Sequence, residues 1–232
     1  MYIFDKVEVK DKNFAVEKLI EQSTPNHSFY IMVILAVAMA TLGLLMDSAA
    51  VVIGSMLISP LLFSLLGIAM GLSMSNVRLI IRSGYTFLWS LFLGIIVAMI
   101  TTWLFFSFDG ILTNEILSRT LSGLPYLSVA VVAGFAAAFS ITNPKLNESF
   151  SGIAISVALL PPIATIGIGI GLLNLDVIRG ASSLLITNVV GILAASLVVF
   201  SIVNLHSRKS LVDKVLKEED KELKENKMDT KI

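Results

Sequence analysis

The arrangement of this sequence in long, nearly uninterrupted apolar runs restricts its fold more than any other feature. A helix needs about 20 apolar residues to cross the hydrocarbon core of a bilayer. Hydrophobic residues make up 56% of the 232 residues, charged residues make up 15%, and the mean hydropathy is +0.87. The sequence therefore predicts an all-α polytopic membrane protein with six transmembrane helices. The six runs occupy residues 29–46, 49–74, 85–106, 126–142, 150–173 and 181–203.

The polar residues outside these runs divide the chain into five segments. The N-terminal residues lack the basic start followed directly by an apolar core that marks a signal peptide. The central connection interleaves charged and apolar residues, as an interfacial helix does, and the Lys/Glu-rich tail has spacings typical of a solvated helix. We predict a cytoplasmic N-terminal segment at 1–28, a three-helix repeat at 29–106, an interfacial linker at 107–125, a second three-helix repeat at 126–204 and a charged cytoplasmic tail at 205–232.

The distribution of basic residues predicts the orientation of the chain in the membrane. With six spans, the two termini and the second and fourth connections lie on one side. Of the 17 Lys and Arg residues, all except Arg119 and Arg179 then lie on that side. Because basic residues near transmembrane segments are enriched in the cytoplasm, we expect both termini to be cytoplasmic.

The two halves of the chain resemble each other at a separation of about 100 residues. Gly67 aligns with Gly167, Gly71 with Gly171, and Asn76 with Asp176. Each half contains three predicted spans, and an odd number means that the second copy enters the membrane from the opposite face. We therefore predict two inverted three-helix repeats, the architecture of many secondary transporters.

Prolines interrupt the second span of each predicted repeat close to its centre. Pro60 follows Ser59 in the first repeat, and Pro161 and Pro162 are adjacent in the second. Proline removes an N–H and leaves backbone groups that hydrocarbon cannot satisfy. We interpret Ser59 as a helix cap with Pro60 as the first residue of a half-helix, and Pro162 as the start of the matching half-helix.

Such breaks at the membrane midplane predict a binding site. The N-terminal ends of half-helices favour an anion, and the carbonyls before the prolines favour a cation, so the charge of the ligand stays open. Simple proline kinks that help helices to pack are the alternative. Asn188 has a similar alternative, an interhelical hydrogen bond. The candidate substrate-binding residues are Ser55, Ser59, Pro60, Ser64, Ser156, Pro161, Pro162, Thr165, Thr187 and Asn188.

The residues that are absent from the apolar runs argue against catalysis. The chain has no cysteine, and its two histidines, His27 and His206, lie outside these runs. Thiol chemistry and Cys-ligated metals are therefore excluded, and no nucleophile with a base is visible. We expect no enzyme activity, no metal, no cofactor and no nucleic-acid partner. The expected partners are the lipid bilayer, a small solute or ion and, as one option, further copies of the chain.

Three stretches of the sequence resemble a known family. Residues 52–61, 155–164 and 184–190 are similar to the signature stretches of an uncharacterised hydrophobic membrane domain, catalogued as domain of unknown function 389. The resemblance extends over about residues 29 to 204. It implies a six-helix membrane protein of the prokaryotic cytoplasmic membrane. Since the family has no agreed activity, the resemblance implies almost nothing about function.

The predicted architecture favours a secondary transporter or permease that moves a small solute or ion by alternating access. No Asp, Glu or His lies deep in a span, so a proton relay lacks its usual group. An oligomeric channel is one alternative. A non-transporting structural or regulatory membrane subunit, whose charged tail docks a partner, is the other.

Overall fold

The computed structural model describes residues 9–105, 112–143, 159–205 and 209–229, and all its regular elements are helices. The all-α prediction is therefore confirmed for the described residues. The helices are α1 (Val9–Ser23), α2 (His27–Leu45), α3 (Ala49–Leu57), α4 (Leu61–Ser73), α5 (Val77–Phe105), α6 (Asn114–Ser118), α7 (Leu124–Thr142), α9 (Leu160–Gly171), α10 (Leu175–Ile202) and α11 (Lys209–Asp229).

Four of the described helices, α2, α5, α7 and α10, are long and apolar enough to cross a membrane. The pair α3 and α4 is apolar enough to form a fifth span, but it is bent by 53° at the break between the two helices. The predicted span at 150–173 is described only in its second part, where α9 is a short apolar helix. The other residues of this span lie outside the described part of the chain.

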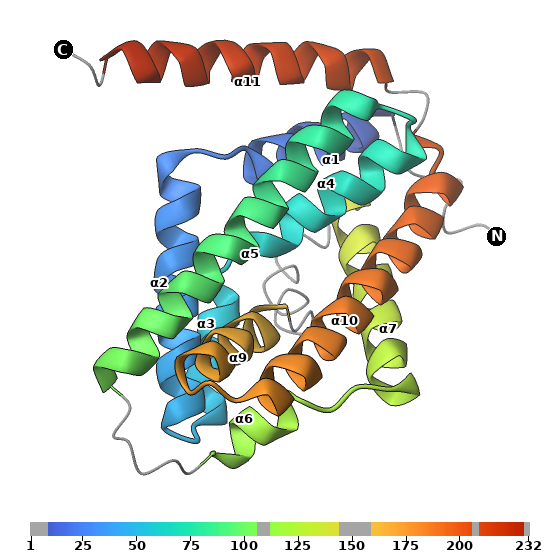
Figure 1. Ribbon diagram of the computed structural model, residues 1–232. Coiled ribbons are helices and arrows are strands. Elements are labelled where there is room, and N and C mark those ends of the chain that lie inside the picture. The colour runs from blue at the N-terminus through green and yellow to red at the C-terminus, as the bar shows by residue number, and fades with distance from the viewer. Residues whose placement is uncertain (1–8, 106–111, 144–158, 206–208, 230–232) are drawn as a thin grey trace.

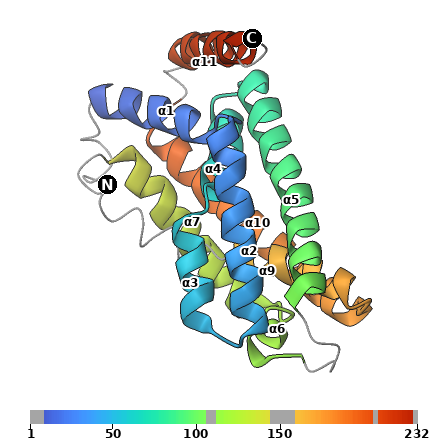
Figure 2. The same cartoon turned by 90° about the vertical axis from the view of Figure 1, so that its left-hand side faces the viewer.

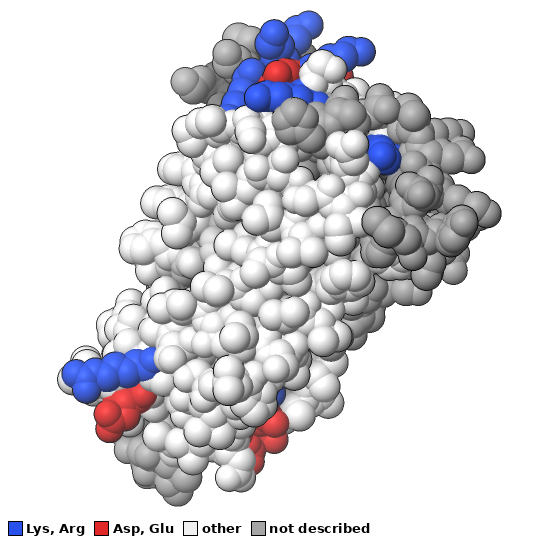
Figure 3. All heavy atoms as spheres, turned by 90° about the vertical axis from the view of Figure 1, so that its right-hand side faces the viewer, with Lys and Arg blue, Asp and Glu red and all other residues white. Residues whose placement is uncertain are grey.

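The surface of the molecule also fits helices that cross a membrane. On the face shown in Figure 3, Lys, Arg, Asp and Glu gather at the two ends, and a broad uncharged band separates them. Many large apolar side chains are exposed on the four long helices, including Ile81, Leu104 and Val132, each more than 60% exposed. Such a surface is unfavourable in water and suits lipid. The chain is therefore compatible with a membrane protein.

The two short helices α4 and α9 lie along the same long helix and run in opposite directions. The C-terminal end of α4 approaches the start of α5 closely, since a Cβ atom on Gly71 would lie 2.8 Å from Ile80 Cγ1. Helix α9 begins beside the middle of α5, where Gly94 contacts Ile163, and ends beside Thr102. The N-terminal ends of both short helices therefore point towards the central part of α5. Helix α10 packs against both of them as well (Figure 1).

Three tight turns between helices are built in the same way. After α2, α4 and α9, a residue with a side chain adopts a positive φ: Asp47 (53°), Ser75 (52°) and Leu173 (55°). The next amide donates to a carbonyl five residues back, namely to Gly43, Gly71 and Gly169, in a Schellman motif. The absence of a Cβ at each glycine lets the following helix approach within contact distance.

The turns after α4 and α9 correspond to each other in detail. The side chains of Asn76 and Asn174 both accept hydrogen bonds from amides in the first turn of the next helix, at 3.0 Å and 3.1 Å. Gly71 and Gly169 occupy equivalent places before them. The sequence comparison instead aligned Asn76 with Asp176. The alignment of the two halves is therefore wrong by two residues at this turn. It rested on identities between common apolar residues, which do not report the capping geometry.

The first and last helices cover one end of the molecule. Helix α11 lies across this end, beside α1 and the α4–α5 turn (Figures 1 and 2). Its Asp220 forms ion pairs with Arg78 and Arg82, the latter at 3.2 Å, and Asp213 accepts a hydrogen bond from Asn76 at 2.9 Å. The tail is a helix, as predicted. The two aspartates nevertheless bind α5 and the turn before it, which the spacings within the tail did not predict.

The opposite end is closed by the short helix α6. Thr113 donates a hydrogen bond to the Leu44 carbonyl at 2.6 Å, and Asp47 accepts one from the Glu115 amide at 2.8 Å. Ile116 is fully buried. The predicted interfacial helix in the linker is thus short and fixed to the end of α2.

Helices α7 and α10 pack closely through small residues. A Cβ atom on Gly134 would lie 2.6 Å from Ile192 Cα, and one on Gly191 would lie 2.7 Å from Ala130 Cβ. Ser196 adds a hydrogen bond to the Gly134 carbonyl at 3.2 Å. These contacts follow the small-residue rule for helix pairs in membranes.

We predict that Gly134→Ala lowers the thermal stability of the detergent-solubilised protein, because the added methyl group meets backbone atoms of α10. Overpacking of this kind costs about 1–3 kcal/mol. Gly84→Ala is the matched control, since a Cβ atom at Gly84 meets nothing within 4 Å. Equal melting temperatures for the two variants would contradict the close approach of α7 and α10.

We predict that Asp220→Asn releases α11, because it leaves Arg82 without its counter-ion while the Arg82 side chain is only 14% exposed. The loss is roughly 1–2 kcal/mol, since Asp220 itself is partly solvated. Faster trypsin cleavage within α11 would report it. Glu218→Gln is the control, because Glu218 pairs with Lys214 of the same helix and both side chains are exposed. No difference between the variants would disprove this role of Asp220.

Candidate functional site

The break between α3 and α4 contains Ile58, Ser59 and Pro60, and it leaves backbone groups of both helices without helical partners. The Ser59 amide donates to the Met56 carbonyl at 3.4 Å, and the Ser59 hydroxyl accepts weakly from the Leu61 amide at 3.4 Å. Pro60 has no N–H. The end of α3 therefore offers carbonyl groups and the start of α4 offers amide groups at one place.

The prolines lie at helix starts, but not in the predicted positions. Pro60 is the residue that caps α4, without a side-chain cap, and Leu61 is the first helical residue. The cap was predicted at Ser59 and lies one residue later; the Ser59 hydroxyl reaches only the Leu61 amide, through a long hydrogen bond of 3.4 Å. Helix α9 begins at Leu160, so Pro161 and Pro162 lie inside its first turn rather than Pro162 at its start.

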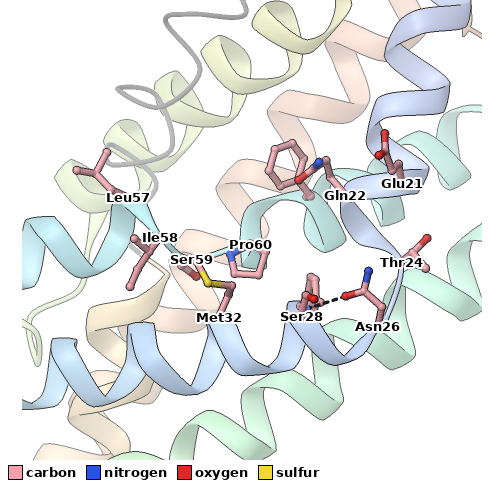
Figure 4. Close-up of a pocket in the computed structure, with 12 residues that line it drawn as sticks. Glu21, Gln22, Thr24, Asn26, Ser28, Met32, Leu57, Ile58, Ser59 and Pro60 are labelled. Atoms are coloured by element: carbon pink, nitrogen blue, oxygen red, sulfur yellow. Dashed lines mark hydrogen bonds between the residues drawn. The ribbon is translucent and has the colours of Figure 1, made fainter. Parts of the chain in front are cut away.

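A pocket of about 350 Å³ lies beside the break (Figure 4). One wall consists of the end of α1, the connection to α2 and the first turns of α2, and the other is the end of α3 with the start of α4. Polar and apolar side chains both line it. The lining residues are Glu21, Gln22, Thr24, Asn26, Ser28, Phe29, Met32, Leu57, Ile58, Ser59, Pro60 and Phe63.

Several polar groups of the pocket are held in place by hydrogen bonds. The Asn26 side chain caps α2 by accepting from the Phe29 amide at 2.7 Å. The Thr24 hydroxyl donates to the Ile20 carbonyl at 2.7 Å and accepts from the Arg82 guanidinium at 3.0 Å. Because Arg82 also pairs with Asp220, the wall of the pocket is connected to α11 through one side chain.

The start of α9 differs from the break at Pro60, because it is enclosed. Leu160 is 2% exposed, and Pro161 and Pro162 are also buried. Thr165 donates to the Pro161 carbonyl at 2.9 Å. No residue of α9 or α10 lines the pocket described above. Among the described residues, the two proline sites therefore do not share this pocket.

The predicted hydroxyl residues are placed at different depths of the bundle. Ser59 lines the pocket, whereas Ser55, Ser64 and Thr165 are fully buried. The hydroxyls of Ser55, Ser64, Thr165 and Thr187 all donate to carbonyls of the preceding turn in their own helix, at 2.6–2.9 Å. Their lone pairs remain able to accept. Ser156 lies outside the described residues.

Asn188 has a central position that the sequence predicted only in part. It is 6% exposed and lies near the middle of the 28-residue helix α10. Ser90, fully buried, lies near the middle of the 29-residue helix α5. The register that aligns Asn76 with Asn174 also aligns Ser90 with Asn188. Sequence reasoning missed Ser90 because it used the other register.

Sequence reasoning also missed the wall of the pocket formed by residues 21–32, because it treated the N-terminal segment as separate from the bundle. The sequence did contain a signal for this wall: Asn26 stands just before an apolar run, where asparagine is a preferred helix cap. Among the described residues, no group of three or more His, Asp or Glu side chains is placed to hold a metal ion.

Comparisons with known proteins agree with the sequence resemblance. Residues 56–194 match the family model described as a domain of unknown function, DUF389. The chain is 30% identical over 172 residues to the uncharacterized protein MJ0678 of Methanocaldococcus jannaschii, an alignment that covers 74% of this chain and 52% of the relative. The chain thus spans about half the length of this relative. No solved structure matches the chain. On the family match, the chain belongs to the DUF389 family.

Proposed function

We propose that this protein moves a small solute or ion across the prokaryotic cytoplasmic membrane by alternating access between two inverted three-helix repeats. In this proposal α2 to α5 form the first repeat, α7 to α10 form the second, and both termini are cytoplasmic. Transporters of this architecture bind their substrates at discontinuous helices near the repeat interface.

The observation that carries the proposal is the arrangement of α4 and α9 on α5. Both short helices start near its middle and run to opposite ends, as the contacts of Gly71 and Gly171 with α5 indicate. Two copies of one repeat with opposite orientation in the membrane produce this arrangement. The matching turns at Asn76 and Asn174 support the same relation.

The unequal exposure of the two proline sites supports access from one side at a time. Pro60 lines a pocket that extends to the end of the molecule carrying α1, whereas Pro161 and Pro162 are enclosed. In an alternating cycle, the opposite state would open the second site and close the first. In this proposal a solute contacts Ser59 and the backbone at the break within the pocket, whereas Ser90 and Asn188 are buried outside the pocket and become accessible only in another state of the cycle.

The absence of cysteine from the chain allows a direct test with single cysteines. We predict that the thiol introduced by Ser59→Cys reacts with a membrane-impermeant maleimide from both sides of sealed vesicles, with different rates. Lys214→Cys on α11 and Ser122→Cys near the start of α7 are controls that should react from opposite single sides. Reaction of the Ser59→Cys thiol from one side alone under all conditions would contradict the proposal, and equal, simultaneous access from both sides would favour a channel.

We predict that Pro60→Ala, combined with Ser59→Cys, slows this labelling at least about ten-fold while the protein still inserts and elutes as one species. The restored amide allows a continuous helix across residues 58–60, which removes the second wall of the pocket. Gly84→Ala in the same background is the control. Unchanged labelling rates in the Pro60→Ala variant would show that the proline does not maintain the opening.

A further inference from the structure

We infer that the pocket at the α3–α4 break binds a small organic cation with an apolar body, and that Glu21 selects its charge. The inference names the substrate class of the site in the proposed function and therefore rests on that proposal. It is carried by the charges, the helix ends and the apolar side chains that surround the pocket.

The helix ends around the pocket do not select a charge by themselves. Helices α1 and α3 end here and present the negative ends of their dipoles, whereas α2 and α4 begin here and present the positive ends. At α2, the Asn26 side chain and carbonyl already accept from the Phe29 and Tyr30 amides. At α4, Pro60 brings no N–H. Two negative and two positive helix ends therefore surround the pocket, and the amides at the positive ends are partly hydrogen-bonded. The side-chain charges then decide which sign of ligand the pocket favours.

The side-chain charge at the pocket is negative. Among the lining residues, Glu21 is the one with an ionisable side chain. Arg82 lies behind Thr24 and does not line the pocket, and its guanidinium pairs with Asp220 at 3.2 Å, a carboxylate that it shares with Arg78. Within the described part of the chain, the ion pairs that join α11 to α5 use Asp220, and Glu21 belongs to none of them. The Glu21 side chain is exposed at the α1 edge of the pocket, across from Ser59 (Figure 4), where its carboxylate attracts a cationic ligand.

The other walls suit a cation that carries apolar groups rather than a bare metal ion. Phe29 and Phe63 bring aromatic rings from α2 and α4, and Met32 and Leu57 add further apolar surface. Alkylammonium groups bind to aromatic faces, whereas hard metal ions require several oxygen ligands in place of their water. A volume of about 350 Å³ is at the lower end of the range of ligand pockets, about 300–1,000 Å³. The geometry therefore favours a compact organic ammonium ion.

The experiment measures how well a ligand protects the thiol of the Ser59→Cys protein, full-length and in detergent, against a maleimide. Three probes of similar shape are compared: choline, its neutral carbon analogue 3,3-dimethylbutan-1-ol, and the anion 3,3-dimethylbutyrate. We expect choline to slow the labelling about five-fold or more at a concentration at which the neutral analogue and the anion have little effect. Such a difference corresponds to about 1 kcal/mol of charge selectivity.

Glu21→Gln in the same background should reduce protection by choline to that of the neutral analogue. Glu17→Gln is the matched control, because Glu17 is exposed on the same helix one turn earlier and does not line the pocket. Size-exclusion profiles show whether both variants fold. Equal protection by the three probes, stronger protection by the anion, or full protection by choline in Glu21→Gln would each overturn the inference.

The two proposals fail in different ways. If the Ser59→Cys thiol reacts from both sides of the membrane at different rates but choline does not protect it, transport stands and the substrate class is wrong. If choline protects this thiol with the expected dependence on Glu21, but labelling occurs from one side alone, the cation site stands without transport.

Discussion

The unsatisfied backbone at a helix break determines how the rest of this molecule is organised. In hydrocarbon every peptide group needs a partner within the protein, so a half-helix has to be enclosed by other helices. Helices α4 and α9 meet this requirement between α5 and α10, which contact both of them. The break at 58–60 is enclosed on one side by α2 and the segment before it, and the remaining space is the pocket. The helix break thus accounts both for the packing of α4 against its neighbours and for the candidate site.

Close helix approach is the second general feature of the fold. Glycines at the ends of α2, α4 and α9 let the next helix turn back directly, and Gly134 and Gly191 bring α7 against α10. In a membrane, apolar side chains gain little by leaving lipid, so van der Waals contact between backbones has greater weight. This explains why many large side chains of this chain are exposed while its small residues are buried.

The sequence predicted those parts of the structure that depend on local composition. Apolar runs indicated the long helices, Pro60 indicated the break between α3 and α4, and the short motifs indicated the family. The pocket depends on contacts between segments distant in the sequence, such as Thr24 with Arg82, and no periodicity reports these. The spacings in the tail predicted a solvated helix, yet Asp220 of this helix pairs with α5. The one-residue error at Pro60 and the shifted register at Asn76 arise because capping is decided by hydrogen-bond geometry, not by residue type alone.

The three tight turns have a mechanical consequence. At each of them a residue with a side chain, Asp47, Ser75 or Leu173, holds a left-handed conformation that costs of order 1 kcal/mol and that two capping hydrogen bonds maintain. Bending such a corner requires several bonds to break together. The joint at 58–60 has a weakly bonded hydroxyl and a proline instead. The three turns are therefore stiffer than the break at residues 58–60, and bending of the bundle concentrates at this break beside the pocket.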